Sequence, residues 1–319
     1  MNSISTVDNL MIAYYKARRG KSANREVMEF SKNLSANILR LREELVDGNV
    51  KVGEYTYFEI HDPKRRLICA ASFRERVLHH AIINVCKPYF ERHLIYDTYA
   101  TREGKGIYAA IDKARHAMKS YPYVAKLDVR KYFDSIDHAI LKDRLRRIFK
   151  DPYLLKIFDN IVDSYSIEDN RGVPIGNLTS QYFANYYLSS LDHHIKEVLR
   201  VPCYVRYMDD MLVFGTTQQE VNRYVREIDA MATDSLGLTL KTPQISACKY
   251  GVSFLGYKLF ATKILLNRRS KLRFVRRMKL YAANMESGIW SEQIYFNHIT
   301  PLLAFAQKAY TRNLRVAFI

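Results

Sequence analysis

Three aspartates are the residues of this sequence best suited to chemistry. Asp209 and Asp210 stand side by side between two short apolar stretches that read as the strands of one hairpin. Two-residue hairpin loops prefer Asn-Gly or Asp-Gly, and adjacent carboxylates repel each other unless a cation lies between them. Such a pair alone is more often a plain turn. Asp128, however, also stands near the end of an apolar stretch that reads as a strand, 123–129.

Three converging carboxylates would make a site for hard cations. If the strand carrying Asp128 lies beside the hairpin in one sheet, the three side chains meet, and carboxylate oxygens are ligands that Mg²⁺ prefers. Two such ions, about 3.5–4 Å apart, stabilise the attacking and leaving oxygens of an in-line phosphoryl displacement. One ion lowers the pKa of an attacking hydroxyl and the other neutralises a leaving pyrophosphate. The pattern therefore indicates nucleotidyl transfer.

The charge of the chain fits a nucleic-acid partner. Its 319 residues include 50 Lys and Arg against 33 Asp and Glu, a net charge of +17, which indicates a polyanionic ligand. No apolar run approaches the roughly 20 residues that a membrane-spanning helix needs, so we expect no membrane partner. Four cysteines without a Cys-x-x-Cys pair indicate neither a zinc ribbon nor a disulfide framework. The polar start, residues 1–10, lacks a signal peptide's pattern.

The spacing of apolar residues predicts the helices and strands that must position the aspartates. Their order along the chain predicts an α+β fold with an antiparallel-rich sheet and helices on one face. Expected helices are 7–45 with a break at Gly20, 74–90, 107–118, 136–149, 179–199 and 219–235. Expected strands are 52–60, 67–71, 123–129, 203–208, 211–215 and 252–259. Two helical stripes follow: Phe274, Met278, Tyr281 and Met285, then Ile299, Leu302, Leu303, Ala306 and Tyr310.

Three blocks of this sequence resemble reverse transcriptases. Tyr207-Met208-Asp209-Asp210 is similar to their signature hairpin, and 127–137 (LDVRKYFDSID) resembles the first palm motif of group II intron, retron and related bacterial enzymes. Phe254-Leu255-Gly256-Tyr257 resembles their primer-grip hairpin. The resemblance covers roughly residues 62 to 257, with the blocks in the right order.

This resemblance implies a right-hand polymerase architecture with fingers, an antiparallel-sheet palm and a short helical thumb. Residues 1–120 would be N-terminal helices and fingers. Residues 121–262 would be the palm, with an inserted fingers segment at about 140–175. Residues 263–319, which carry 11 Lys and Arg against 2 Asp and Glu, would be a basic helical thumb.

The resemblance also implies residue roles. Asp128, Asp209 and Asp210 would be catalytic and, together with Val129, would hold two Mg²⁺ ions, for which Mn²⁺ can substitute; Asp209 is the firmer ligand of the pair. The nucleotide-binding set would be Lys64, Arg66, Arg74, Phe133, Ile175, Gly176, Gln181 and Lys241. Leu255, Gly256 and Tyr257 would form the primer grip. Nucleic acid would bind Arg268, Arg269, Lys271, Arg273, Arg276 and Arg277.

Three members of the nucleotide-binding set have more specific expected roles. Arg66 matches a finger cation that holds the incoming triphosphate. Phe133 stands where these enzymes place an aromatic gate against the ribose 2′-hydroxyl, although it could be an ordinary core aromatic. Lys241 could be the lysine that protonates pyrophosphate, with Lys249 as the competing candidate.

One departure points to a subfamily. Most reverse transcriptases carry Gln-Gly followed by Ser-Pro between the two carboxylate motifs, whereas this chain has Ile175-Gly176 and Ser180-Gln181. That pattern is similar to the reverse transcriptases of diversity-generating retroelements. An Ile offers only packing where a Gln could hydrogen-bond, so base selection loses roughly 1–3 kcal/mol of contrast.

This subfamily resemblance implies a distinctive function. The enzyme would copy a template-repeat RNA into cDNA with low fidelity at adenines (mutagenic retrohoming). It would bind dNTPs, the primer–template duplex and an oligomer of a small basic accessory protein of the accessory variability determinant type. It would be bacterial or phage-encoded and cytoplasmic.

Two alternatives stay open at this point. One is a retron-type or antiphage-defence reverse transcriptase. The other is a non-catalytic RNA-binding scaffold, with which the basic C-terminal segment is compatible but which gives no reason for three retained carboxylates.

Overall fold

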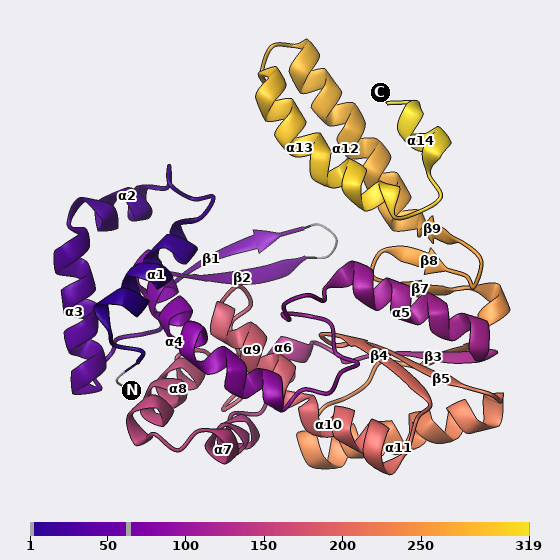
Figure 1. Ribbon diagram of the computed structural model, residues 1–319, viewed down its shortest axis with the longest axis horizontal. Helices are drawn as coiled ribbons and strands as arrows, with labels where there is room; N and C mark the ends of the chain where they lie inside the picture. Colours follow the sequence, from indigo (N-terminus) through magenta and orange to yellow (C-terminus); the bar gives the residue numbers. More distant parts are fainter. Residues whose placement is uncertain (1–2, 62–64, 319) are drawn as a thin grey trace. The chain divides into compact units, whose positions relative to one another are not determined.

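The computed structural model describes residues 3–61 and 65–318, which fold into two compact units (Figure 1). Unit 1 comprises Met1–Tyr96, Val129–His194 and Asp229–Leu240. Unit 2 comprises Asp97–Asp128, Ile195–Ile228 and Lys241–Ile319. Mixed helices and antiparallel strands confirm the α+β prediction. No helix in the described part of the chain is long and apolar enough to span a lipid bilayer.

Unit 1 is mostly helical. Its helices are α1 (Val7–Arg18), α2 (Arg25–Lys32), α3 (Leu34–Asp47), α4 (Phe73–Arg92), α6 (Tyr132–Ser135), α7 (His138–Ile148), α8 (Pro152–Asp163), α9 (Leu178–Tyr187) and α10 (Ser189–His193). A two-stranded sheet pairs β1 (Tyr55–Ile60) with β2 (Arg66–Ala71) in antiparallel fashion. The expected break at Gly20 is confirmed, because residues 19–24 separate α1 from α2, which the Asn24 side chain caps. A second break, at Asn33, separates α2 from α3 and was not predicted.

The expected helix 179–199 is also interrupted. α9 ends at Tyr187, α10 follows at Ser189, and the last turn, His194–Val198, is a π-helix. Arg200 then adopts a positive φ of 52°, which turns the chain before the next strand. An apolar stripe alone cannot reveal such breaks, because each short helix keeps the same buried face.

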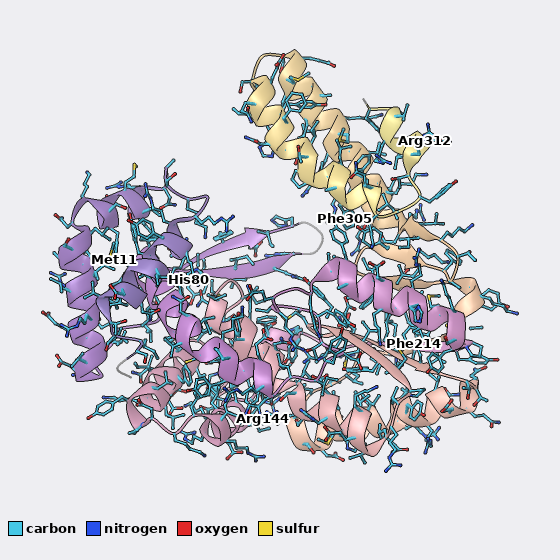
Figure 2. All side chains as sticks on the ribbon, in the orientation of Figure 1. Met11, His80, Arg144, Phe214, Phe305 and Arg312 are labelled. Atoms are coloured by element: carbon cyan, nitrogen blue, oxygen red, sulfur yellow. The ribbon has the colours of Figure 1, made fainter. Side chains whose placement is uncertain are left out.

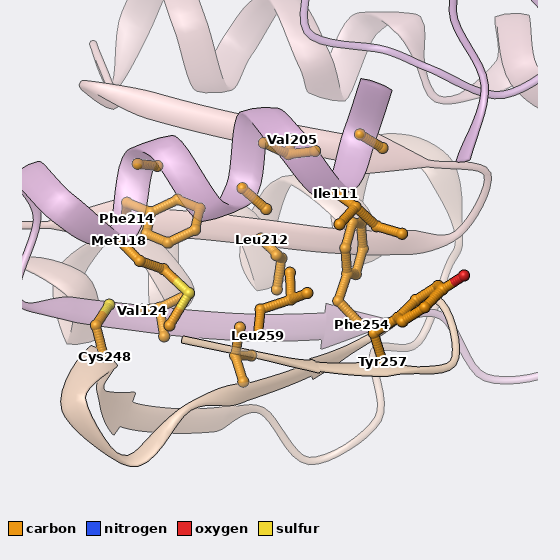
Figure 3. Close-up of a cluster of buried hydrophobic side chains, with 14 of the residues drawn as sticks. Ile111, Met118, Val124, Val205, Leu212, Phe214, Cys248, Phe254, Tyr257 and Leu259 are labelled. Carbon is orange, nitrogen blue, oxygen red and sulfur yellow. The ribbon is translucent and has the colours of Figure 1, made fainter. Parts of the chain in front are cut away.

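Unit 2 is built on a four-stranded antiparallel sheet with strand order β4-β5-β3-β6. The strands are β3 (Tyr123–Asp128), β4 (Cys203–Tyr207), β5 (Asp210–Gly215) and β6 (Gln244–Ala247). Helix α5 (Ile107–Ser120) packs on this sheet, and α11 (Gln218–Leu236) begins in this unit and ends in unit 1. Figure 3 shows the core between α5 and the sheet, where Ile111 and Met118 meet Leu212 and Phe214.

A second sheet joins β7 (Val252–Phe254), β8 (Tyr257–Leu259) and β9 (Ile264–Leu266). The prediction of one strand over 252–259 is therefore wrong. Leu255 and Gly256 have φ of 48° and 91°, and positive φ at both loop residues is the signature of a tight hairpin turn. An apolar run that contains a single Gly does not distinguish a long strand from such a hairpin.

The C-terminal helices are α12 (Arg268–Glu286), α13 (Glu292–Gln307) and α14 (Arg312–Val316). Phe274 and Met278 of the first predicted stripe and Ile299 and Ala306 of the second are buried together. Tyr310 does not belong to that core: it follows the end of α13 and is 86% exposed. The side chains of these helices are drawn in Figure 2.

Candidate active site

Asp128 and Asp210 lie side by side in the sheet of unit 2. Asp128 ends β3, and its Cα partner on β5 is Asp210, which also pairs with Tyr207 of β4. Asp209, the residue before Asp210, lies in the hairpin loop between β4 and β5. The first aspartate and the paired ones, far apart in sequence, therefore meet at one end of the sheet, as the strand pattern predicts.

The hairpin loop differs by one residue from the expected one. Its two loop residues are Met208 and Asp209, while Asp210 already belongs to β5. Met208 has a φ of 53°, a conformation that glycine usually supplies in such loops. Backbone strain of this kind persists only where the surroundings enforce it, and it gathers at functional sites.

Arg206 is one of the groups that hold this loop. Its side chain is fully buried, and its Nη1 donates to the carbonyl oxygen of Met208 at 3.1 Å. Its backbone N–H donates to the Asp97 carbonyl at 3.0 Å, and its own carbonyl accepts from the Tyr99 N–H at 2.9 Å. The strained loop is thus braced by a buried guanidinium on β4.

The three carboxylates share a crowded electrostatic environment. Burial raises the pKa of Asp209 to about 6, and the negative charges of Asp128 and Asp210 contribute to the shift. Lys241 opposes it: its Nζ donates to Asp128 Oδ1 at 2.5 Å. A carboxyl pKa that stays raised beside like charges is typical of a site where the neighbouring cations do not fully offset burial and repulsion, and a bound cation would stabilise such a site.

Two of the three carboxylates form ion pairs with lysines. Besides the Lys241–Asp128 contact, the Nζ of Lys126 on β3 lies 3.3 Å from Asp210 Oδ1, a buried oxygen that makes no hydrogen bond to any residue the structure describes. Within residues 3–61 and 65–318, no three His, Cys, Asp or Glu side chains form a ready-made metal cluster. The donor set of Asp128 and Asp209 nevertheless fits a hard cation, because these are half-buried carboxylates whose mutual repulsion a cation would relieve.

The expected primer-grip residues form the turn between β7 and β8. The Gly256 carbonyl accepts from the Asn267 N–H at 3.1 Å, and a Cβ on Gly256 would lie 2.8 Å from the ring of Phe305, so only glycine fits there. Tyr257 is fully buried, and its hydroxyl donates to the Phe305 carbonyl at 2.8 Å. Its side chain therefore anchors the turn to α13, and Leu255 and Gly256 are the residues at the tip.

Several expected nucleotide-binding residues come together in unit 1. The Val173 N–H donates to the Phe133 carbonyl, and the Cys69 N–H of β2 donates to the Ile175 carbonyl, both at 2.9 Å. A Cβ on Gly176 would lie 3.1 Å from both Ile68 Cγ2 and the Cys69 carbonyl oxygen. The loop before α9 is thus fastened between β2 and the segment that carries Phe133.

The start of α9 holds buried polar groups without partners. Asn177 Nδ2, Thr179 Oγ1 and Ser180 Oγ are buried and make no hydrogen bond within the described part of the chain. Gln181 lies in the first turn of the same helix and is half-buried. Unsatisfied buried groups are costly unless a ligand or water completes them, so this helix start fits a polar ligand.

The other Lys and Arg residues expected to bind nucleotide or nucleic acid differ in their exposure and in their partners. Arg74 forms an ion pair with Glu44 and donates to the Lys51 carbonyl at 3.0 Å, so it is engaged within unit 1. Arg66 begins β2 and is exposed, whereas Lys64 lies outside the described residues. The cations of the expected thumb lie on α12: Arg268, Arg269, Lys271 and Arg276 are exposed, and Arg273 and Arg277 are half-buried.

Comparison with protein families and curated proteins gives a consistent result. A family model described as reverse transcriptase (RNA-dependent DNA polymerase) matches residues 60–259. Protein YkfC of Escherichia coli is 21% identical over 82% of this chain and 81% of its own length. The putative COX1/OXI3 intron 1 protein of Saccharomyces cerevisiae is 20% identical over 63% of this chain, which spans only 26% of that protein.

Comparison with solved structures supports the fold. The telomerase of Candida albicans, solved in complex with a fragment of telomeric RNA, superposes with a TM-score of 0.51 at 11% identity. The match covers 75% of this chain, which spans about half (52%) of the telomerase chain. The similarity extends the antiparallel α+β architecture to a right-hand polymerase fold.

Proposed function

The chain belongs to the reverse transcriptase family of RNA-dependent DNA polymerases, and we propose that it extends a DNA primer along an RNA template with Asp128 and Asp209 as its metal-holding carboxylates. The observation that carries this proposal is the pairing of Asp128 with Asp210 at the end of the sheet, with Asp209 in the adjoining loop. At this place burial, together with the negative charges of Asp128 and Asp210, raises the pKa of the Asp209 carboxyl to about 6.

The proposed chemistry uses the groups of unit 2. Two divalent ions, Mg²⁺ or Mn²⁺, would lower the pKa of the primer 3′-hydroxyl and neutralise the leaving pyrophosphate. Asp128 and Asp209 would hold them, with Val129 following directly on Asp128. Asp210, held by Lys126, would adjust the charge of the site. Lys241, already hydrogen-bonded to Asp128, would donate a proton to the pyrophosphate as its bond to the α-phosphorus breaks.

Primer extension tests this function directly. Purified chain with an RNA template, a DNA primer, dNTPs and Mg²⁺ should extend the primer, and Asp209→Asn should reduce extension at least a thousandfold while the protein stays folded. Asp128→Asn should do the same. RNA binding without any metal-dependent incorporation would instead identify a scaffold protein and would overturn the proposal.

We further propose that the enzyme is of the diversity-generating type. Ile175 supports this, because its side chain cannot hydrogen-bond where most reverse transcriptases have Gln, and the loop around it is fastened by its own backbone. The template would be a template-repeat RNA, the product a cDNA with substitutions at adenine positions, and the partner an oligomeric small basic accessory protein.

The flanking DNA gives the clearest test of this finer assignment. Two nearby repeats that differ almost only at adenine positions would support it, as would frequent misincorporation opposite template adenines in vitro. A gene for a structured, branched RNA next to the coding sequence would instead identify a retron-type or antiphage-defence enzyme and overturn the subtype.

A further inference from the structure

A cavity lies in unit 2 where three loops meet. Its volume is about 590 Å³, within the range of small-ligand sites. It is lined by the end of α5 and the loop to β3, by the turn after β6, and by the β8–β9 hairpin loop. The backbone joins two of these segments, since the Cys248 N–H donates to the Pro122 carbonyl at 2.7 Å. The cavity is thus part of the folded unit.

Buried side chains form the inner wall of the cavity. Met118 and Cys248 line it and also belong to the core of unit 2, where Figure 3 shows both near Val124. Both are nearly inaccessible to solvent, at 5% exposure. The inner wall is therefore set by the packing of α5 against the sheet.

Lysines surround the cavity without carboxylate partners. Lys119 and Lys249 line it, and Lys258 and Lys263 flank it. No Asp or Glu is among its described lining residues, and none of these four lysines forms an ion pair within residues 3–61 and 65–318. Positive charge that the protein does not compensate attracts a polyanion.

An aromatic side chain provides a wall. The Phe260 ring lines the cavity, and the Nζ atoms of Lys258 and Lys263 each lie 5.6 Å from its centre. A Cβ on Gly251 would lie 2.7 Å from that ring, so glycine is required there for the ring to occupy this position. Tyr121 and Tyr123 are also among the lining residues. Aromatic faces beside lysines are the composition of single-strand binding sites.

The cavity is separate from the proposed active site. Tyr123 and Ala247, which line it, are register partners at the start of β3, whereas Asp128 ends that strand. Five residue steps along a strand span about 17 Å. A ligand in the cavity would therefore leave the carboxylates free.

We propose that this cavity binds a single-stranded segment of nucleic acid, with a base against Phe260 and phosphates near Lys119 and Lys249. The interior of a duplex would not bind in this way, because each base there is stacked on its neighbours and has no free face for the ring. The site would hold an unpaired part of the RNA that is being copied, an identification that rests on the proposed function, while primer and paired template occupy the active site.

Binding of a labelled single strand to the full-length chain tests the proposal. The probe is a fluorescent 12-nucleotide oligo(U), titrated with the protein in the presence of a saturating unlabelled hairpin primer–template that occupies the polymerase site. Lys119→Gln combined with Lys249→Gln should weaken oligo(U) binding about tenfold. The slope of log affinity against log salt should fall by about 1.4, since each phosphate contact contributes about 0.7 in single strands.

Two further variants complete the design. Phe260→Leu keeps an apolar side chain but removes the stacking face, and it should weaken binding about fivefold without changing the salt slope. Lys32→Gln combined with Lys156→Gln removes the same charge from exposed sites of unit 1 and should leave oligo(U) binding unchanged.

Three results would overturn the proposal: equal losses in the control, an unchanged salt slope in the Lys119/Lys249 variant, or complete displacement of oligo(U) by the hairpin. None of these measurements needs catalysis, so their failure would leave the proposed polymerisation standing.

Discussion

Lys241 and Asp128 are joined twice: the Lys241 backbone N–H donates to the Asp128 carbonyl at 2.8 Å, and its Nζ donates to Asp128 Oδ1 at 2.5 Å. The backbone contact fixes the lysine beside the aspartate, and the ammonium neutralises a carboxylate that would hold a metal ion. A cation bound at Asp128 would compete with this ammonium for the carboxylate, and the displaced ammonium would be available to the leaving pyrophosphate.

Replacing Lys241 by Gln should accordingly have opposite effects on binding and turnover. Divalent-metal affinity of the nucleic-acid-free protein should rise several-fold, because Asp128 loses its competing partner and a repelling charge leaves the site. The kcat for primer extension should fall by about 10²-fold, the usual size of a general-acid contribution. Calorimetric titration with Mn²⁺ and single-turnover extension measure the two quantities.

The control for Lys241→Gln is Lys32→Gln on α2, which should change neither quantity. An unchanged kcat in Lys241→Gln would contradict the role of proton donor, whatever happens to metal affinity.

Asp209 should limit the stability of the metal-free protein. Because folding raises the pKa of Asp209 from its ordinary 3.8 to about 6, the folded state binds more protons than the unfolded state between these values. The free energy of unfolding therefore decreases as the pH rises from about 4 to 6, and the destabilisation persists above pH 6. Asp209→Asn should relieve it, stabilising the protein at pH 7.5 by about 1 to 3 kcal/mol.

Urea unfolding in EDTA at pH 4 and pH 7.5 measures this effect. The two proteins should be nearly equally stable at pH 4, and the difference should appear only at the higher pH. Mg²⁺ should then stabilise the wild type and leave Asp209→Asn nearly unaffected. A variant that is less stable than the wild type at pH 7.5 without metal would refute this account of the site.

The sequence predicts the strand pairing at this site but not its side-chain contacts. The meeting of Asp128 with the hairpin was predictable, because apolar strands ending in carboxylates pair through backbone hydrogen bonds. The bracing of Met208 by Arg206 was not, because a charged residue in a strand ordinarily indicates a solvent-facing position and here is fully buried. The apolar run of β4 gave a weak signal, since Arg206 directly follows three buried residues, Cys203, Tyr204 and Val205.

The side-chain contacts of Arg74 and Lys126 were likewise not predictable from the sequence. Arg74 was predicted to bind a nucleotide, but its ion pair with Glu44 joins residues 30 positions apart, and spacing does not reveal such pairs. Lys126 was not singled out, although it stands two residues before Asp128 on the same face of β3 and so reaches Asp210. Tyr310 shows the converse: helical spacing placed it in the core, and the end of α13 leaves it exposed.

Phe133 should discriminate against ribonucleotides if it acts as the gate. The residue is half-buried in the short helix α6, with its ring 5.8 Å from that of Tyr132. Phe133→Ala should raise the efficiency of ribonucleotide incorporation relative to deoxynucleotide at least tenfold, because the space for a 2′-hydroxyl opens. Phe133→Tyr keeps the bulk of the ring and should retain the discrimination. Equal discrimination in wild type and Phe133→Ala, measured by kcat/KM for dNTP and rNTP, would make Phe133 a packing residue.

Ile175 should govern fidelity without governing the fold. The loop is held by its backbone, since the Cys69 N–H donates to the carbonyl oxygen of Ile175 and not to its side chain. Ile175→Gln should therefore fold normally and add a hydrogen-bonding group at the expected nucleotide site. One such contact is worth about 1 kcal/mol or more, so misincorporation opposite template adenine should fall about five- to tenfold.

Sequencing of the cDNA from a defined RNA template measures this error rate, and Ile175→Leu is the matched control. Leu keeps the apolar side chain, so its error spectrum should equal that of the wild type. If Gln and Leu give the same spectrum, selection of the base does not pass through this side chain. Low fidelity would then have to arise from other residues, such as the buried polar groups at the start of α9, where Thr179 and Ser180 lack partners within the described residues. Thr179→Val would be the next variant to test, because it removes an unsatisfied hydroxyl while keeping the shape of the side chain.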